Sequence, residues 1–253
     1  MSNEKFLSER KQVWNTAAAS DAKYYVIAGV DDRQEWALND FFMSGQNDVE
    51  KFVLPFLQQM QMDPSTKSMV EIGCGVGRIT HTFAQVFQQV TAFDISKEMI
   101  RQAKELNTGL SNICFTEGSG ASLQPVQDST IDFCFSYLVF THFSKLWLFE
   151  KYFSEIARVL RPGGLFKIEL DGRAWGPYLI PRFLYNQLVS SDFIKDKLAP
   201  LFFFWLDKKS LHAAPGLHFS EQAIRSLVSS ANLEVLAVEN PNQHRMWVVG
   251  RKS

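Results

Sequence analysis

The sequence lacks the features that mark several large classes of protein. It has three cysteines, all far apart, and no CxxC or HExxH spacing, so neither a disulfide framework nor a zinc site is expected and no metal is predicted. Its longest apolar run, 201–206, is far shorter than the roughly 18 residues of a membrane span. The N-terminus is charged and shows no apolar signal-peptide core. We therefore expect a soluble, cytoplasmic protein that does not bind membranes.

An excess of positive charge is also lacking. Lys and Arg number 26 against 27 Asp and Glu, which gives a formal net charge of -1. Proteins that bind nucleic acid phosphates usually carry a basic excess, so nucleic acid is not an expected partner. A hydrophobic fraction of 46% excludes disorder as the main state. The length of 253 residues fits one α/β domain with an added cap, and we expect a monomer or a homodimer.

The first 60 residues show the periodicity of helices and not that of strands. Apolar residues recur at helical spacing around Trp14, and two further helices are predicted at 35–43 and 47–60. The segment Met43-Ser-Gly45 lies between these two helices and is predicted to act as a hinge. The sequence therefore predicts a helical unit that can move over the rest of the chain.

From residue 68 onward, short apolar runs alternate with helical segments. Strands are predicted at 69–72, 90–94, 112–115, 131–136 and 165–170. A helix is predicted at 78–88, and Ser96 and Ser144 are predicted to be the N-cap residues of two more. Alternation of strand and helix at this rhythm predicts a parallel sheet with helices on both faces.

The C-terminal end departs from this alternation. After a helix capped by Ser220, two strand-like runs at 233–239 and 246–251 are joined by a short polar linker, which predicts an antiparallel pair. The predicted fold is thus α/β, a Rossmann-like, doubly wound, mostly parallel seven-stranded sheet with an antiparallel C-terminal strand. The predicted domains are an N-terminal helical cap at 1–62 and a core at 63–253 with a helical insertion at 177–212 after strand five.

A glycine-rich turn follows the first predicted strand. The segment Glu71-Ile-Gly-Cys-Gly-Val-Gly77 opens a helix, so its backbone can approach a ligand at a helix N-terminus. A P-loop is excluded because no Gly-Lys-Ser/Thr follows, and a dinucleotide fingerprint needs glycine at position 78, which is Arg. The third class of ligand is S-adenosylmethionine (SAM), which has no phosphate. Glu71 would repel a pyrophosphate but suits the cationic methionine moiety of SAM.

Asp94 ends the second predicted strand, 21 residues after Gly73. An acid at about this distance binds the ribose diol in Rossmann-like folds, because both hydroxyls can donate to one carboxylate. The alternative is that Asp94 is only an acid ahead of the helix capped by Ser96. The glycine turn and Asp94 together favour a SAM site at the carboxyl ends of the strands.

Five segments of the chain match a known order of motifs: 71–78, 93–99, 118–123, 132–136 and 159–165. They resemble the motifs of class I SAM-dependent methyltransferases of the bacterial small-molecule type, over roughly residues 64–172. One departure is Ser119, which stands where many relatives carry an Asp. The resemblance implies that SAM is the cofactor and that its contacts are Glu71, Gly73, Cys74, Gly75, Gly77, Arg78, Asp94, Ile95, Met99, Ser119, Gly120, Ala121, Ser136 and Tyr137.

The carboxyl ends of the fourth and fifth strands supply the candidates for catalysis. Methyl transfer requires alignment of acceptor, methyl and sulfur, and removal of a proton if the acceptor carries one. His142 is the leading candidate for a general base because its ordinary pKa lies near neutrality. Tyr137 is a candidate for orienting the acceptor, and Asp171 for binding an amine or accepting a proton. A helix cap, a pocket wall and a strand-end turn are the structural alternatives for the three residues.

Two aromatic regions are predicted to enclose the acceptor, because aromatic walls exclude water. The candidate contacts are Tyr24, Tyr25 and Trp36 in the cap, and Trp175 and Tyr178 near the insertion. An enclosed pocket favours a small-molecule O- or N-methyltransferase (EC 2.1.1.-). Cyclisation of SAM and aminocarboxypropyl transfer remain open, since the cofactor motifs would be the same. A nucleic-acid or protein methyltransferase is less favoured, and the segment 136–139 lacks the proline pair of base amino-methylating enzymes.

Overall fold

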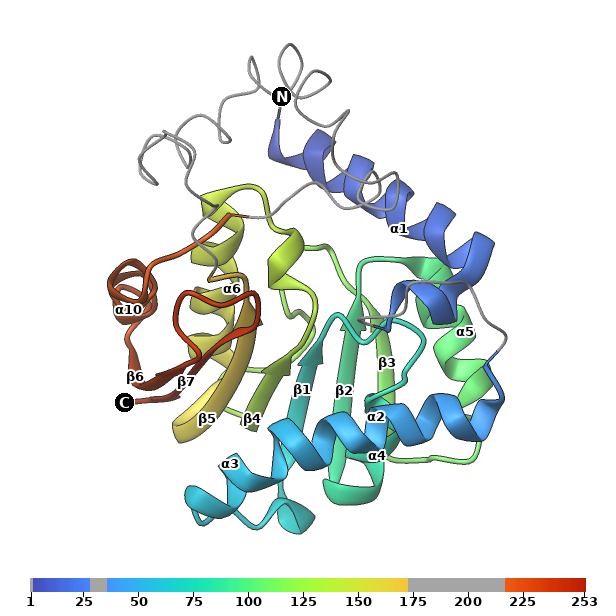
Figure 1. Cartoon of the computed structure of the whole chain (residues 1–253), viewed down its shortest axis with the longest axis horizontal. Helices are drawn as coiled ribbons and strands as arrows, with labels where there is room; N and C mark the ends of the chain where they lie inside the picture. Colours follow the sequence, from blue (N-terminus) through green and yellow to red (C-terminus); the bar gives the residue numbers. More distant parts are fainter. Residues whose placement is uncertain (1, 28–35, 173–216) are drawn as a thin grey trace.

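The computed structural model describes residues 2–27, 36–172 and 217–253, and the strands within them form one seven-stranded sheet (Figure 1). The strand order is β3-β2-β1-β4-β5-β7-β6, and β7 runs antiparallel to both of its neighbours. The strands are β1 (Ser68–Ile72), β2 (Gln89–Asp94), β3 (Ile113–Glu117), β4 (Ile131–Ser136), β5 (Leu160–Leu170), β6 (Leu233–Glu239) and β7 (Met246–Lys252). The predicted fold class, including the antiparallel strand near the C-terminus, is confirmed.

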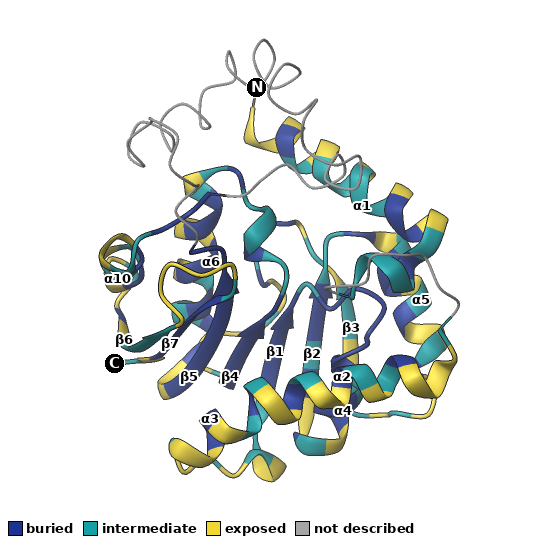
Figure 2. Cartoon of the chain, in the orientation of Figure 1, coloured by how far each residue is buried: buried dark blue, intermediate teal, exposed yellow. Residues whose placement is uncertain are grey.

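Helices cover both faces of the sheet, which explains why its central strands are apolar on both sides (Figure 2). On one face, α6 (Leu146–Val159) and α10 (Glu221–Ser229) pack against side chains such as Val70 and Cys134. On the other face, α3 (Leu54–Gln59) and α4 (Thr80–Val86) pack against Met69 and Phe133. All six residues of β4 are buried as a result.

The N-terminal helices occupy two different places. The helix α1 (Asn3–Tyr25), which is kinked at Asp21, lies beyond the carboxyl ends of the parallel strands and next to α5 (Lys97–Leu106) (Figure 1). The helix α2 (Leu38–Phe52) instead packs with α3 against the sheet and α4. The predicted cap at 1–62 is therefore divided between the ligand side of the sheet and one of its faces.

The hinge predicted at 43–45 is wrong. The helix α2 runs without interruption through Met43, Ser44 and Gly45. A side chain at Gly45 would collide with the backbone carbonyl of Arg78, so glycine is needed here for close packing and not for bending. A glycine inside a helical pattern does not by itself distinguish these two roles.

Most predicted strands lie within two residues of their observed bounds, whereas the helices predicted at 35–43 and 47–60 are instead 38–52 and 54–59. The Ser96 hydroxyl accepts a hydrogen bond from the Met99 amide at 3.1 Å, and the Ser220 hydroxyl caps α10 in the same way, as predicted. By contrast, α6 begins after Lys145, so Ser144 precedes the cap position. The helix α4 starts at Thr80, and β5 already starts at Leu160, because this residue pairs with Ile131 across a register shift.

Short 3-10 helices at Pro64–Thr66 and Phe140–His142 complete the described elements. Within 2–27, 36–172 and 217–253, no helix is long and apolar enough to cross a bilayer. The same three ranges contain no group of three or more potential metal ligands. The predicted insertion at 177–212 lies outside the described residues.

Candidate functional site

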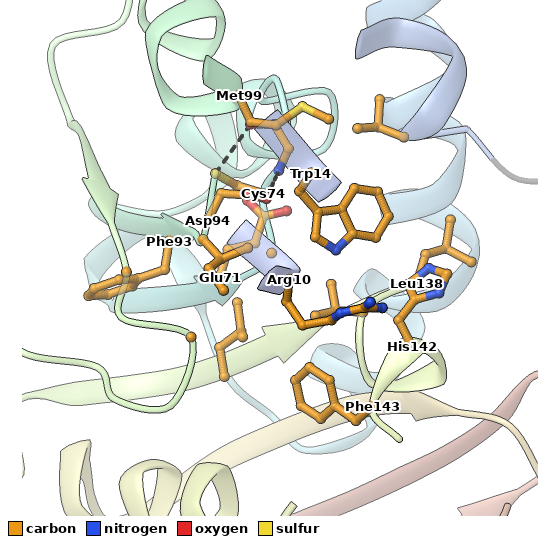
Figure 3. Close-up of a pocket in the computed structure, with 18 of the residues that line it drawn as sticks. Arg10, Trp14, Glu71, Cys74, Phe93, Asp94, Met99, Leu138, His142 and Phe143 are labelled. Atoms are coloured by element: carbon orange, nitrogen blue, oxygen red, sulfur yellow. Dashed lines mark hydrogen bonds between the residues drawn. The ribbon is translucent and has the colours of Figure 1, made fainter. Parts of the chain in front are cut away.

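A cavity opens where the strand order reverses, between β1 and β4, at the carboxyl ends of the strands. Ligands of open α/β sheets bind at this switch point, because the loops after the two central strands diverge there. Figure 3 shows the side chains that line it: the floor comes from the turns after β1, β2 and β4, and the roof from α1. Residues from the N-terminal helix and from the strand ends thus enclose one site.

The glycine turn after β1 has the backbone conformation that its sequence predicts. Gly73, Gly75 and Gly77 have φ values of +78°, +54° and +82°, in the left-handed region that favours glycine. The amides of Gly73 and Cys74 both donate to the carbonyl of Phe93, which ties the turn to the end of β2. Gly73, Cys74 and Gly75 line the cavity, whereas Gly77 faces Asn107 and Phe115 and contributes to packing.

Asp94 lines the cavity at the end of β2 and orders the turn beside it. Its carboxylate accepts hydrogen bonds from the amides of Gly75 at 2.9 Å and Ser96 at 2.8 Å. Burial is the main reason that the pKa of Asp94 rises to about 6, and the backbone hydrogen bonds act in the opposite direction. Each carboxylate oxygen has a second lone pair, so the group can still accept from two ligand hydroxyls.

Glu71 and Arg78 also line the cavity, but their side chains are held by the protein. The Thr80 hydroxyl donates to the Glu71 carboxylate at 2.6 Å, and burial raises the pKa of Glu71 to about 7. The Arg78 guanidinium pairs with Asp48 of α2 at 2.7 Å. Glu71 is thus placed to bind a cation, while the charge of Arg78 ties α2 to the glycine turn.

The cofactor contacts predicted after β2 and β3 divide into two groups. Ile95, Met99 and Gly120 line the cavity together with Gly118 and Ser122. Ser119 is exposed, and its hydroxyl accepts from the amide of Ala121 outside the cavity. Neither Ser119 nor Ala121 is part of the cavity lining, so this turn contributes Gly118, Gly120 and Ser122 to the cavity and not Ser119.

The turn after β4 places Tyr137 in the lining but not Ser136. The Ser136 hydroxyl donates to the carbonyl of Ile72 and thereby joins β4 to β1. Tyr137 stacks on Trp247 with 5.4 Å between ring centres, and burial raises the pKa of its hydroxyl, which keeps the group a hydrogen-bond donor. Leu138 has a φ of +61°, and its amide donates to the buried carboxylate of Glu169 at 3.0 Å. Glu169 therefore holds a strained turn that the sequence did not reveal.

His142 lines the cavity, as predicted for the leading catalytic candidate. Its ring packs edge-on against Trp14 with 5.2 Å between ring centres. Burial, followed by the nearby charges of Arg10 and His244, lowers the pKa of His142 to about 4. The imidazole is therefore neutral and only weakly basic near pH 7, which is poorly matched to a general base.

Asp171 does not reach the described lining of the cavity. It is buried at the end of β5, where its carboxylate lies 3.1 Å from Nδ1 of His244 and 3.3 Å from Nδ1 of His218. Asp171 was predicted to lie near the site because it follows the end of the fifth strand. Its pairing with two histidines from distant segments was not predictable from spacing.

Of the predicted acceptor contacts, Tyr25 lines the cavity. Tyr24 packs edge-on against Tyr25, and Trp36 accepts a hydrogen bond from Lys23 through its carbonyl, so both support the wall from outside. Trp175 and Tyr178 lie outside the described residues.

Sequence reasoning missed several lining residues, and most of them are on or near α1. Phe6, Leu7, Arg10 and Val26 line the cavity, as does Tyr152 of α6. The signal available was the four-residue interval between Phe6, Arg10 and Trp14, which places them on one face of a helix.

The comparisons with known proteins agree with this geometry. A family model described as a methyltransferase domain matches residues 70–168. Malonyl-[acyl-carrier protein] O-methyltransferase from Pectobacterium atrosepticum is 32% identical over 97 residues, which are 38% of this chain and 36% of the relative. Squalene methyltransferase 1 from Botryococcus braunii is 34% identical over 110 residues, which are 42% of this chain and 28% of the relative. The chain thus spans about a third of the length of these two curated relatives.

Among solved structures, magnesium protoporphyrin IX methyltransferase from Synechocystis, determined with bound S-adenosylhomocysteine, superposes with a TM-score of 0.63. The match covers 98% of this chain and 99% of that chain at 15% identity, so it bears on the fold. Fold, strand order and matched segment agree with one another. Residues 70–168 therefore match the methyltransferase domain family, and the chain has the fold of class I methyltransferases.

Proposed function

We propose that this protein is an enzyme that transfers the methyl group of SAM to an oxygen or nitrogen atom of a small-molecule acceptor. The observation that carries the proposal is the Asp94 carboxylate, which lies in the cavity wall beside the glycine turn at the switch point of the sheet. This arrangement fits an adenosyl ligand, because the carboxylate can accept from the ribose hydroxyls while the turn leaves room for the backbone to approach.

The chain's own residues have distinct roles in this proposal. When bound, SAM supplies an electrophilic methyl group on a positively charged sulfur. Glu71 faces its cationic methionine portion, and Asp94 holds the ribose. Tyr137 donates a hydrogen bond that orients the acceptor, and the apolar side chains of α1 exclude water from the reacting groups.

A small acceptor group is supported by the roof that α1 forms and by the matched relatives, whose names specify squalene and a malonyl group carried on acyl-carrier protein. Cyclisation of SAM or transfer of its aminocarboxypropyl arm would need the same cofactor contacts and is the second candidate. Incubation with labelled SAM and small-molecule extract separates the two reactions. S-adenosylhomocysteine as the product supports methyl transfer, whereas methylthioadenosine would contradict it.

The cofactor assignment is tested at Asp94. We expect Asp94→Asn to weaken S-adenosylhomocysteine binding about ten- to a hundredfold, since a charge-assisted contact contributes about 1.5–3 kcal/mol. Calorimetry measures the affinity, and Asp128→Asn, at an exposed carboxylate, is the matched control. Unchanged binding in a folded Asp94→Asn variant would refute the ribose contact.

A further inference from the structure

One positively charged side chain lies in the roof of the cavity. Phe6, Arg10 and Trp14 occur at four-residue intervals on α1, and all three line the cavity. They therefore lie on one face of the helix, with the arginine between two aromatic residues. Figure 3 shows the guanidinium of Arg10 reaching across the cavity toward His142 and Phe143, away from Met99.

The charge of Arg10 has no partner in the described part of the chain. No carboxylate there pairs with it, and its Nε atom is buried with no hydrogen-bond acceptor. Its one described contact as a cation is the Phe6 ring, 5.8 Å away. The buried cations Arg78 and Lys167, by contrast, each have a carboxylate at 2.7 Å.

Arg10 is partly buried in this apolar wall, and its Nε atom is shielded from water without an acceptor. An anion that enters the cavity would therefore pair with a charge and satisfy a donor that the described residues leave open. The planar guanidinium also matches a carboxylate better than it matches a spherical ion, because two parallel hydrogen bonds can form. We propose that Arg10 binds a carboxylate inside the cavity, supplied either by the methionine portion of SAM or by the acceptor.

The distribution of charge in the cavity supports this assignment, which rests on the proposed function. Glu71 and Asp94, both acidic, lie on the glycine-turn side, and Arg10 extends toward the turn after β4. The low pKa of His142 leaves that ring neutral, so no second cation competes for the anion there. The cavity is therefore complementary to ligands that present a cation or hydroxyls to one side and a carboxylate to the other.

If the acceptor supplies the carboxylate, the chemistry needs no base. A carboxylate oxygen is already deprotonated near pH 7. Its lone pair forms the new bond to the methyl carbon while the carbon–sulfur bond breaks and its electron pair passes to sulfur, which becomes a neutral thioether. The products are a methyl ester and S-adenosylhomocysteine, and no proton is transferred. This balance agrees with a cavity whose histidine is a weak base.

Calorimetry on the full chain distinguishes the two sources. The cofactor carboxylate is tested with S-adenosylhomocysteine and with 5′-methylthioadenosine, which lacks the amino-acid portion. The acceptor carboxylate is tested by adding phenylacetate to the S-adenosylhomocysteine complex. Phenylacetamide, which is uncharged, is the matched control for phenylacetate. The variants are Arg10→Met and Arg10→Lys, which keeps the charge but loses the planar fork. Lys5→Met, at an exposed position of the same helix, is the control.

If the cofactor supplies the carboxylate, Arg10→Met weakens S-adenosylhomocysteine binding about ten- to a hundredfold and leaves 5′-methylthioadenosine binding unchanged. If the acceptor supplies it, Arg10→Met leaves S-adenosylhomocysteine binding unchanged but abolishes a phenylacetate affinity that phenylacetamide does not share. Arg10→Lys falls between Arg10→Met and the unmodified protein in either case.

Two results would count against these assignments, and they differ. Wild-type protein that binds no S-adenosylhomocysteine refutes the proposed function itself. Wild-type protein that binds it, with Arg10→Met folded and equal to wild type for every ligand, overturns the role of Arg10 alone. Circular dichroism and the melting temperature establish that each variant is folded.

Discussion

At the scale of single residues, Glu71 destabilises the folded protein when its carboxyl group is ionised, and the same charge has a role in binding. It is 4% exposed, and its folded pKa of about 7 lies above the ordinary value of 4.5. The folded state therefore holds this proton more tightly than the unfolded chain does. Glu71 contributes stability that is fully present below about pH 4.5 and is lost as the pH rises to about 7.

We expect Glu71→Gln to remove this loss. The amide keeps an oxygen that can accept from Thr80, so the apo variant should be more stable than wild type near pH 8, by up to roughly 3 kcal/mol, and similar to it near pH 5. Urea unfolding at the two pH values measures the difference, with the exposed Glu105→Gln as the control.

The same substitution should weaken S-adenosylhomocysteine binding, by about tenfold, because the negative charge opposite the ligand amine is gone. A variant that is less stable than wild type near pH 8 would show that the carboxylate is not destabilising. A variant with unchanged binding would show that Glu71 does not face the methionine portion.

Substitutions at Gly75, in the glycine turn, and at Ser119, after β3, should have very different effects on cofactor affinity. Gly75 has a φ of +54°, and a side chain there would collide with Val26, so Gly75→Val should abolish cofactor binding. Ser119 is exposed and outside the lining, so Ser119→Ala should change the affinity less than threefold. Binding titrations on the two folded variants test this, and equal losses would show that Ser119 contributes to the cofactor site after all.

At the scale of elements, α1 is the part of the N-terminal region that can respond to a ligand. Its Asn15 carboxamide accepts hydrogen bonds from the Ser96 hydroxyl at 2.7 Å and the Glu98 amide at 3.3 Å, which ties it to the start of α5. The helix α2 is anchored elsewhere, through Asp48 and Arg78, and through its buried face against α4 and the sheet.

We therefore expect S-adenosylhomocysteine to protect residues 3–25 from hydrogen exchange while 38–59 exchange as before, because residues of α1 are in the described lining of the cavity and those of α2 and α3 are not. Exchange followed by mass spectrometry measures the protection by segment. Equal rates in α1 with and without ligand would identify it as a static wall, and protection spread over α2 would restore a cap that moves as one unit.

At the scale of the whole molecule, the C-terminal strand stabilises both the core and the site. Trp247 on β7 is 1% exposed and stacks on Tyr137 and on Phe135, with ring centres 5.4 and 5.8 Å away. The antiparallel strand at the end of the chain thus positions the aromatic ring that follows β4.

Trp247→Ala should lower the free energy of unfolding by about 3–5 kcal/mol, the usual cost of removing a large buried aromatic side chain. It should also weaken cofactor binding, because Tyr137 loses the ring on which it stacks. Urea denaturation and calorimetry measure the two effects, with Leu146→Ala at an exposed position as the control. A loss below 1 kcal/mol would show that the stack contributes little.

The sequence by itself determined the sheet, the glycine turn and the acid at the end of β2. Strand periodicity, helix caps at Ser96 and Ser220, and the spacing from Gly73 to Asp94 are all local, so each element carries its own signal. The order of these elements along the chain then restricts the topology, because parallel strands connected by helices can be arranged in few ways.

Only the tertiary structure decided which side chains share the cavity. Arg10 and His142 line the same cavity, the Asp171 carboxylate lies beside His244, and the Glu169 carboxylate accepts from the Leu138 amide. These residues are too far apart along the chain for any local pattern to predict their proximity. The pKa values of about 7 for Glu71 and about 4 for His142 have the same origin, since both follow mainly from burial. Local sequence fixes the conformation of a turn, whereas the solvent and charge around a side chain depend on residues brought together by the fold.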